Sequence, residues 1–129
     1  MILCDTSALI AILKNEPDAR RYREGIAGPQ SASLPASCYL EAAMVASNMI
    51  EGRRDLDQLI EVAKVTFIPL DEPVARIAAD AFARYGRGTG HPAALNFGDC
   101  ISYATAKHLD CPLLFKGDDF RHTDVKVAL

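Results

Sequence analysis

Residues 1–13, MILCDTSALIAIL, decide how the chain is expected to fold. The apolar run at residues 1–4 predicts a short buried strand. The apolar residues further on predict a helix over residues 8–14, capped by one of the two hydroxyl residues that follow Asp5. Asp5 is therefore expected at the carboxyl end of a strand, where its charge stands next to apolar neighbours.

Strands and helices alternate along the rest of the chain. Further strands are expected over residues 30–34, 65–70 and 111–115, with an edge strand over 125–128. Helices are expected around the arginines at 20–23 and over residues 35–51, 55–64, 71–85 and 97–108, with Gly52 ending the second of these. This alternation predicts one α/β domain over residues 1–129, an α/β/α sandwich around a mainly parallel sheet.

Composition narrows the class of protein. Half of the 129 residues are hydrophobic, which is enough for a core without crosslinks. No apolar run is long enough to cross a bilayer, and Asp5 interrupts any signal-peptide core, so no membrane association and a cytoplasmic location are expected. The four cysteines lack the spacing of a zinc site or redox pair, and the three histidines form no ligand pair, so buried reduced thiols are expected.

Four acidic positions stand beside apolar runs. Asp5 follows the first strand, and Asp119, next to Asp118, follows the strand that ends at residue 115. Asp99 falls in the first turn of a helix, and helical spacing places Glu41 on a partly buried stripe. Each acid alone is compatible with a cap or a solvated turn. Because ligands of open parallel sheets bind beyond the carboxyl ends of the strands, we expect these acids to share one pocket.

Carboxylates that converge repel one another unless a cation joins them. Mg²⁺, with Mn²⁺ as an alternative, prefers oxygen ligands and keeps several waters, and such a site suits phosphodiester hydrolysis. No histidine or lysine stands out as a general base, so water activated by the metal is the expected nucleophile. The net charge of -3 argues against holding nucleic acid by bulk electrostatics, unless the acids form one cluster that recruits divalent cations.

Four stretches that carry these acids match a known family. They are MILCDTSALIAIL, SASLPASCYLEAAMV, RYGRGTGHPAALNFGDCISYATAK and PLLFKGDDFRHTDV. In order and spacing the chain resembles PIN domains nearly end to end, and in particular the VapC-type toxins of bacterial type II toxin-antitoxin systems. The resemblance implies a PIN-like fold and a Mg²⁺-dependent endoribonuclease that inhibits translation.

The resemblance also implies roles for single residues. Asp5 and Asp99 would ligate the metal, and Glu41 and Asp119 would complete the acidic pocket, with Asp118 as an alternative to Asp119. Thr6 or Ser7, together with Asn96, would orient the ligands through hydrogen bonds. Three basic residues near the motif loops are candidates for contacts with RNA phosphates: Arg84, Arg87 and Lys116.

The implied partners are an RNA substrate, a cognate VapB-type antitoxin and a second copy of the chain. The antitoxin would lie along a groove and place an arginine near the carboxylates. For a homodimer contact, the apolar helix positions are Leu9, Ile10 and Ile12, or Met44 and Met49, all of which also suit the core.

Two other classes of protein bind Mg²⁺ at strand ends. A receiver domain that accepts a phosphoryl group needs an acidic pair after its first strand, but Asp5 stands alone before Thr6. A haloacid-dehalogenase-type phosphatase needs an acid where Ser7 stands. A PIN-like module that binds partners without catalysis is the third alternative, and the presence of all four acids argues against it.

Overall fold

The computed structural model describes residues 1–129 and contains four strands, six α-helices and one 3₁₀ helix. The first half of the chain contributes β1 (Ile2–Cys4), α1 (Thr6–Leu13), α2 (Ala19–Ile26), β2 (Ala32–Pro35), α3 (Ala36–Ala46) and α4 (Gly52–Val62). The second half contributes β3 (Thr66–Ile68), α5 (Glu72–Tyr85), α6 (Phe97–Leu109), β4 (Leu113–Leu114) and the 3₁₀ helix η1 (Asp119–His122). No helix has the length and apolar character needed to span a membrane.

All four strands are parallel, in the order β3-β2-β1-β4. Leu3 of β1 pairs with Ser33 of β2 on one side and with Leu113 of β4 on the other. The chain first builds the sheet outward from β1 through β2 to β3, and then returns to add β4 on the opposite side of β1. The order of strands therefore reverses between β1 and β4, and open α/β sheets bind their ligands beyond the carboxyl ends at such a point.

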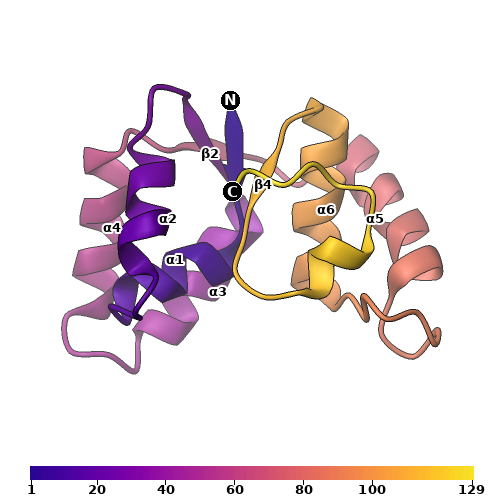
Figure 1. Ribbon diagram of the computed structural model, residues 1–129, viewed down its shortest axis with the longest axis horizontal. Coiled ribbons are helices and arrows are strands. Elements are labelled where there is room, and N and C mark those ends of the chain that lie inside the picture. The colour runs from indigo at the N-terminus through magenta and orange to yellow at the C-terminus, as the bar shows by residue number, and fades with distance from the viewer.

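Alternate residues of the short strands point into two separate cores. Leu3 and Leu113 belong to a core shared with α5 and α6, whereas Cys4 and Leu114 belong to a core shared with the first four helices. This alternation is the two-residue period of a strand that is covered on both faces. Figure 1 shows the resulting sandwich, with α1 to α4 on one side of the sheet and α5 and α6 on the other. The predicted α/β/α architecture is confirmed.

The boundary between α3 and α4 differs from the prediction. The helix expected over residues 35–51 ends at Ala46, and Gly52, which was expected to end it, is the first residue of α4. A Cβ atom at position 52 would lie 2.3 Å from the Ala46 carbonyl oxygen, so the tight connection requires glycine there. The prediction was wrong because it took a glycine needed for close packing as a helix terminator.

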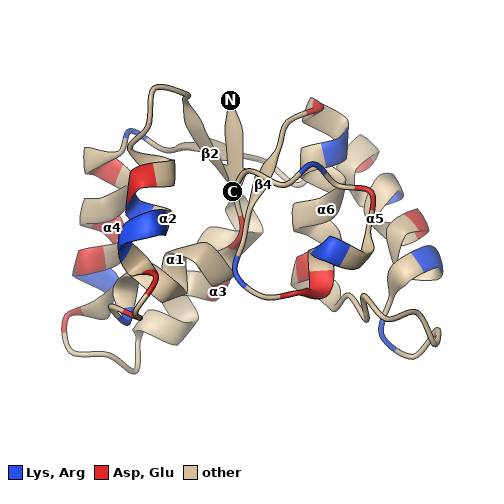
Figure 2. Cartoon of the chain, in the orientation of Figure 1, with Lys and Arg blue, Asp and Glu red and all other residues tan.

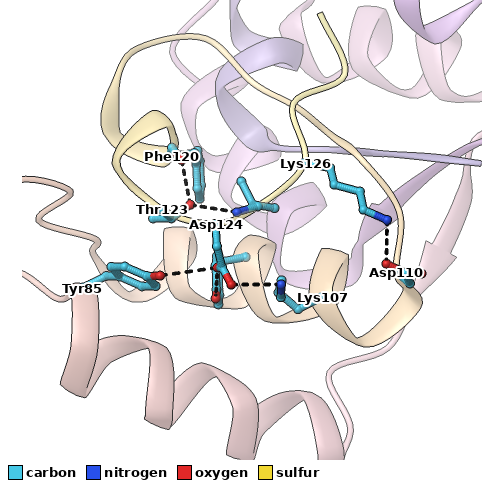
Figure 3. Close-up of polar contacts among 9 residues, drawn as sticks. Tyr85, Lys107, Asp110, Phe120, Thr123, Asp124 and Lys126 are labelled. Carbon is cyan, nitrogen blue, oxygen red and sulfur yellow. Dashed lines mark hydrogen bonds and ion pairs between the residues drawn. The ribbon is translucent and has the colours of Figure 1, made fainter.

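The C-terminal residues lie along the sheet edge without forming a full strand. The strand expected over residues 125–128 reduces to one parallel bridge between Leu113 and Val127. Upstream of it, Asp124 ties the segment to the α5/α6 layer, because its carboxylate accepts hydrogen bonds from Tyr103 at 2.5 Å, Lys107 at 3.1 Å and Tyr85 at 3.4 Å. Figure 3 shows Tyr85, Lys107 and Asp124 converging, together with the Thr123 hydroxyl that donates to the Phe120 carbonyl.

The two tyrosines that donate to Asp124 give a matched test of how these hydrogen bonds hold the C-terminal segment. Both rings are buried, but the Tyr103 hydrogen bond is short and the Tyr85 hydrogen bond is long. Tyr103→Phe should lower the free energy of unfolding by about 1 kcal/mol, and Tyr85→Phe by clearly less. Urea denaturation of the two variants measures this difference. Equal losses would mean that the Tyr103 hydroxyl does not anchor the C-terminal segment.

Candidate active site

Asp5 is a buried carboxylate at the carboxyl end of the central strand. Only 4% of its surface is exposed. Its Oδ2 atom accepts hydrogen bonds from the Ser7 backbone N–H at 3.0 Å and from the Ser7 hydroxyl at 2.6 Å, and its Oδ1 atom accepts one from Ser102 at 2.5 Å. The expected cap of the first helix is corrected here, since α1 begins at Thr6 and Asp5 itself is the N-cap. Three donors thus compensate for the burial of this charge.

The Ser102 hydroxyl continues into a buried chain of hydrogen bonds. Its oxygen lies 3.1 Å from the Cys38 sulfur, and both side chains are fully buried. A hydroxyl has one proton, which Ser102 donates to Asp5, so the Cys38 thiol must be the donor to Ser102. Burial raises the pKa of Cys38 to about 12, which keeps the thiol protonated. All four cysteines are free and buried, as the sequence predicted.

Glu41 reaches the same place from α3. Its Oε1 atom accepts a hydrogen bond from the Thr6 hydroxyl at 3.2 Å. Burial raises the pKa of this carboxyl group, and the nearby negative charge of Asp5 adds to the shift. The carboxylate also packs against Gly98, where a Cβ atom would lie 2.5 Å from Oε1. Gly98 is therefore a site residue that sequence reasoning missed, although a glycine in the first turn of a helix was a visible signal.

Asp99 is held by the start of α6. The Asn96 side chain accepts a hydrogen bond from the Asp99 backbone N–H at 2.9 Å, and the Asp99 carboxylate accepts one from the Asn96 N–H at 3.1 Å. This reciprocal pair is a capping box that uses Asp in place of Glu. Burial raises the pKa of Asp99 to about 6, and repulsion from Asp5, Asp119 and Glu41 contributes. The same side chain thus serves as a cap and as part of an acidic cluster.

Three of the four predicted acids meet in one cavity of about 360 Å³ beyond the carboxyl ends of the strands. Its lining consists of four acids, one cation and four other residues: Asp5, Glu16, Glu41, Asp99, Lys116, Thr6, Ser7, Asn96 and Ile10. Glu16, from the loop after α1, was missed by sequence reasoning because it stands in a polar run typical of solvent-exposed loops. Figure 2 shows acidic segments where β1 ends and where α6 and η1 begin.

Asp119 lies outside the lining of this cavity. It is the first residue of η1 and is exposed, but its charge still contributes to the raised pKa of Asp99. Asp119 thus acts on Asp99 electrostatically, and its role as the fourth acid stays a prediction. Of the three predicted phosphate contacts, only Lys116 lines the cavity, whereas the guanidinium of Arg84 stacks over the Tyr85 ring.

The donor set suits a hard divalent cation. No three histidine, cysteine or acidic side chains are grouped closely enough to ligate one ion together. Mg²⁺, however, takes only one or two carboxylates directly and fills its other positions with water. Asp5 and Asp99 can supply those oxygens, while Glu41 and Asp119 contribute charge. Burial raises the pKa values of Glu41 and Asp99, and the neighbouring carboxylates add to both shifts, so a cation in the cavity would favour the ionised forms.

Comparison with known proteins agrees with the fold and with the resemblance to PIN domains. The family model described as PIN domain matches residues 2–126. The chain is 48% identical to Ribonuclease VapC28 of Mycobacterium tuberculosis over 99% of its own length and 98% of that protein. It is 44% identical to Ribonuclease VapC of Mycolicibacterium smegmatis, over 96% and 97% of the two chains.

Solved structures agree at the level of the fold. A toxin-antitoxin complex from Klebsiella pneumoniae contains a chain with a TM-score of 0.72 and 21% identity, covering 93% of this chain and 90% of that one. VapBC2 from Rickettsia felis, bound to a DNA fragment from its promoter, gives a TM-score of 0.73 at 11% identity, with coverages of 98% and 96%. Together with the full-length identity to curated relatives, this shows that the chain belongs to the PIN domain family and, within it, to the VapC ribonucleases.

Proposed function

We propose that this protein is a Mg²⁺-dependent endoribonuclease toxin that inhibits translation by cleaving RNA and is neutralised by a VapB-type antitoxin. The observation that supports this most directly is the meeting of Asp5, Glu41 and Asp99 in one cavity from three different elements. Two of these carboxyl groups have raised pKa values, as expected for acids placed together to share a cation. Mn²⁺ is the alternative ion.

The residues of the cavity have separate tasks in this proposal. Asp5 and Asp99 hold the ion, which when bound neutralises the scissile phosphate and lowers the pKa of a water molecule. Ser7 and Ser102 fix both oxygens of Asp5, and Asn96 fixes Asp99. Thr6 binds only one of the two carboxylate oxygens of Glu41, so Oε2 is free to orient a water molecule or accept its proton.

An antitoxin partner is consistent with the charge of the chain. The net charge is -3 and four acids line the cavity, so a basic segment of another protein has a complementary surface here. An arginine of that segment, placed among Asp5, Glu41 and Asp99, would take the place of the cation. The VapBC and toxin-antitoxin complexes among the structural neighbours agree with such a partner.

A homodimer is also proposed, with a contact that differs from the helix faces named above. Leu9 and Ile12 lie in the core and cannot form it. An apolar groove of about 450 Å³ between α5 and α6 is a better candidate, because Leu70, Phe82 and Phe97 line it and stay largely exposed. The exposed Met44 on α3 remains available from the original set.

The RNase proposal is tested by cleavage of single-stranded RNA in Mg²⁺. Asp5→Asn and Asp99→Asn should each lower the rate at least about 100-fold, and EDTA should abolish cleavage, because the ion loses a ligand or is removed. Asp80→Asn, at an exposed position of α5, is the matched control and should cleave like the wild type. Equal cleavage by all samples, including those with EDTA, would point to a contaminating nuclease and refute the proposal.

Stability against pH tests the repulsion around Asp99. The folded-state pKa is about 6 against an ordinary value of 3.8, so the contribution of this group to stability is full below about pH 4 and is lost as pH rises to about 6. In EDTA, Asp99→Asn should therefore melt at a higher temperature than the wild type at pH 7.5 and at a similar one at pH 4. Mg²⁺ at pH 7.5 should raise the melting temperature of the wild type more than that of the variant. A pH-independent difference, or identical Mg²⁺ shifts, would count against the assignment.

The dimer contact is tested by a charge placed in the groove. Phe82→Glu should convert a dimer into a monomer in sedimentation velocity, since burying the new carboxylate is unfavourable. Val62→Glu, at an exposed apolar position of α4, should leave the assembly unchanged. A wild-type monomer, or a Phe82→Glu dimer of undiminished affinity, would show that this groove is not the interface.

A further inference from the structure

Lys116 is the one cation among the residues that line the acidic cavity. It follows β4, and its backbone N–H donates to the Ser7 hydroxyl at 3.0 Å, which in turn donates to Asp5. The backbone of Lys116 is therefore tied to the buried carboxylate through a single side chain. Figure 2 shows a basic segment (blue) on the loop that follows β4 and leads to the acidic start of η1 (red).

The side chain of Lys116 turns toward the loop that joins α1 and α2. Its ammonium group forms ion pairs with Glu16 and with Asp18, the latter at 3.0 Å. These hydrogen bonds raise the pKa of Lys116, so the group stays charged. An ammonium has three N–H donors, and the two ion pairs account for two of them. One donor remains for a further oxygen atom.

The two acids of this loop, Glu16 and Asp18, compete with the carboxylates of the cavity for the Lys116 ammonium. A lysine beside Asp5, Glu41 and Asp99 would be attracted into the cavity, where it would compete with a divalent cation. Glu16 and Asp18 give the ammonium two carboxylate partners instead, and it forms no ion pair with Asp5, Glu41 or Asp99. All three side chains of this cluster are about one-third exposed, so the cluster can be reached by a ligand from solvent.

We propose that Lys116 binds a phosphate oxygen of the RNA strand beside the bond that is cut, and that Glu16 and Asp18 are positioning residues that hold its ammonium away from Asp5 and Asp99. This inference rests on the proposed ribonuclease function. RNA is a polyanion, and the other charged groups of the cavity are carboxylates that repel it. Lysine acts as a compact point charge that suits a phosphate oxygen, and its N–H groups form charge-assisted hydrogen bonds to it.

Lys116→Met distinguishes a role in RNA binding from a role in metal binding, because only RNA binding should become weaker. Removing a cation from the cavity should leave Mg²⁺ binding unchanged or tighter, as measured by calorimetry. It should weaken binding of a single-stranded RNA oligonucleotide about fivefold and reduce the slope of log affinity against log salt by about 0.7. RNA binding is followed by fluorescence anisotropy in an Asp99→Asn background with Mg²⁺ present, so that the RNA stays intact.

Lys126→Met is the matched control. Lys126 also pairs with an aspartate, Asp110, at 2.8 Å (Figure 3), but it does not line the cavity. This variant should leave RNA affinity and salt slope unchanged, and Lys116→Arg should restore most of the RNA affinity. If Lys116→Met binds RNA like the control while the wild type cleaves RNA, the proposed role of Lys116 is refuted and the ribonuclease proposal still stands. If the wild type neither cleaves nor binds RNA, the ribonuclease proposal fails as well.

The role of the two acids is tested by Glu16→Gln combined with Asp18→Asn. With these charges removed, the Lys116 ammonium should move toward Asp5 and Asp99 and weaken Mg²⁺ binding. Adding Lys116→Met to this double variant should restore the Mg²⁺ affinity, which a general loss of stability would not allow. Unchanged Mg²⁺ binding in the double variant would show that Glu16 and Asp18 do not position the lysine.

Discussion

The burial of one charge at the end of the central strand is the constraint on which the rest of the structure depends. Asp5 is almost fully enclosed, and it is tolerated because Ser7 and Ser102 donate to both of its oxygens. These donors come from α1 and α6, which lie on opposite sides of the sheet. The two helical layers must therefore close correctly around β1 before this carboxylate is satisfied, so the same contacts that complete the fold also orient the proposed metal ligand.

The other acids of the cavity are less well compensated than Asp5. Asp5 is stabilised by donors, whereas Glu41 and Asp99 have raised pKa values because burial and neighbouring charges act against their ionised forms. The ionised acids of the cavity therefore lower the stability of the fold, and apolar burial in the two cores compensates for this. A ligand that brings positive charge, whether a metal ion or a basic segment of a partner, gains binding energy from relieving this repulsion. The two would compete for the same cavity.

Sequence patterns predicted the architecture, and three of the four acids that they singled out line one cavity, for identifiable reasons. The strand at residues 1–4 was visible because it is short, apolar and followed by an acid, and the capping signal of Asn96 marked the start of α6. Sequence reasoning missed Glu16 and Gly98 because their roles depend on contacts between segments distant in sequence, with Lys116 and Glu41 respectively. The boundary at Gly52 was misplaced for a local reason, since this glycine is required by the close approach of the Ala46 carbonyl at the end of the preceding helix.

The order of the strands has a consequence for synthesis of the chain. The central strand is made first, yet its neighbour β4 and the helix that supplies Ser102 and Asp99 come from the last third of the sequence. A growing polypeptide that carries only the first two thirds has β1 without one partner strand and without the donor to Asp5 Oδ1. The acidic cavity therefore assembles only after α6 and β4 have been synthesised, and a chain that lacks them cannot present Asp5 and Asp99 together.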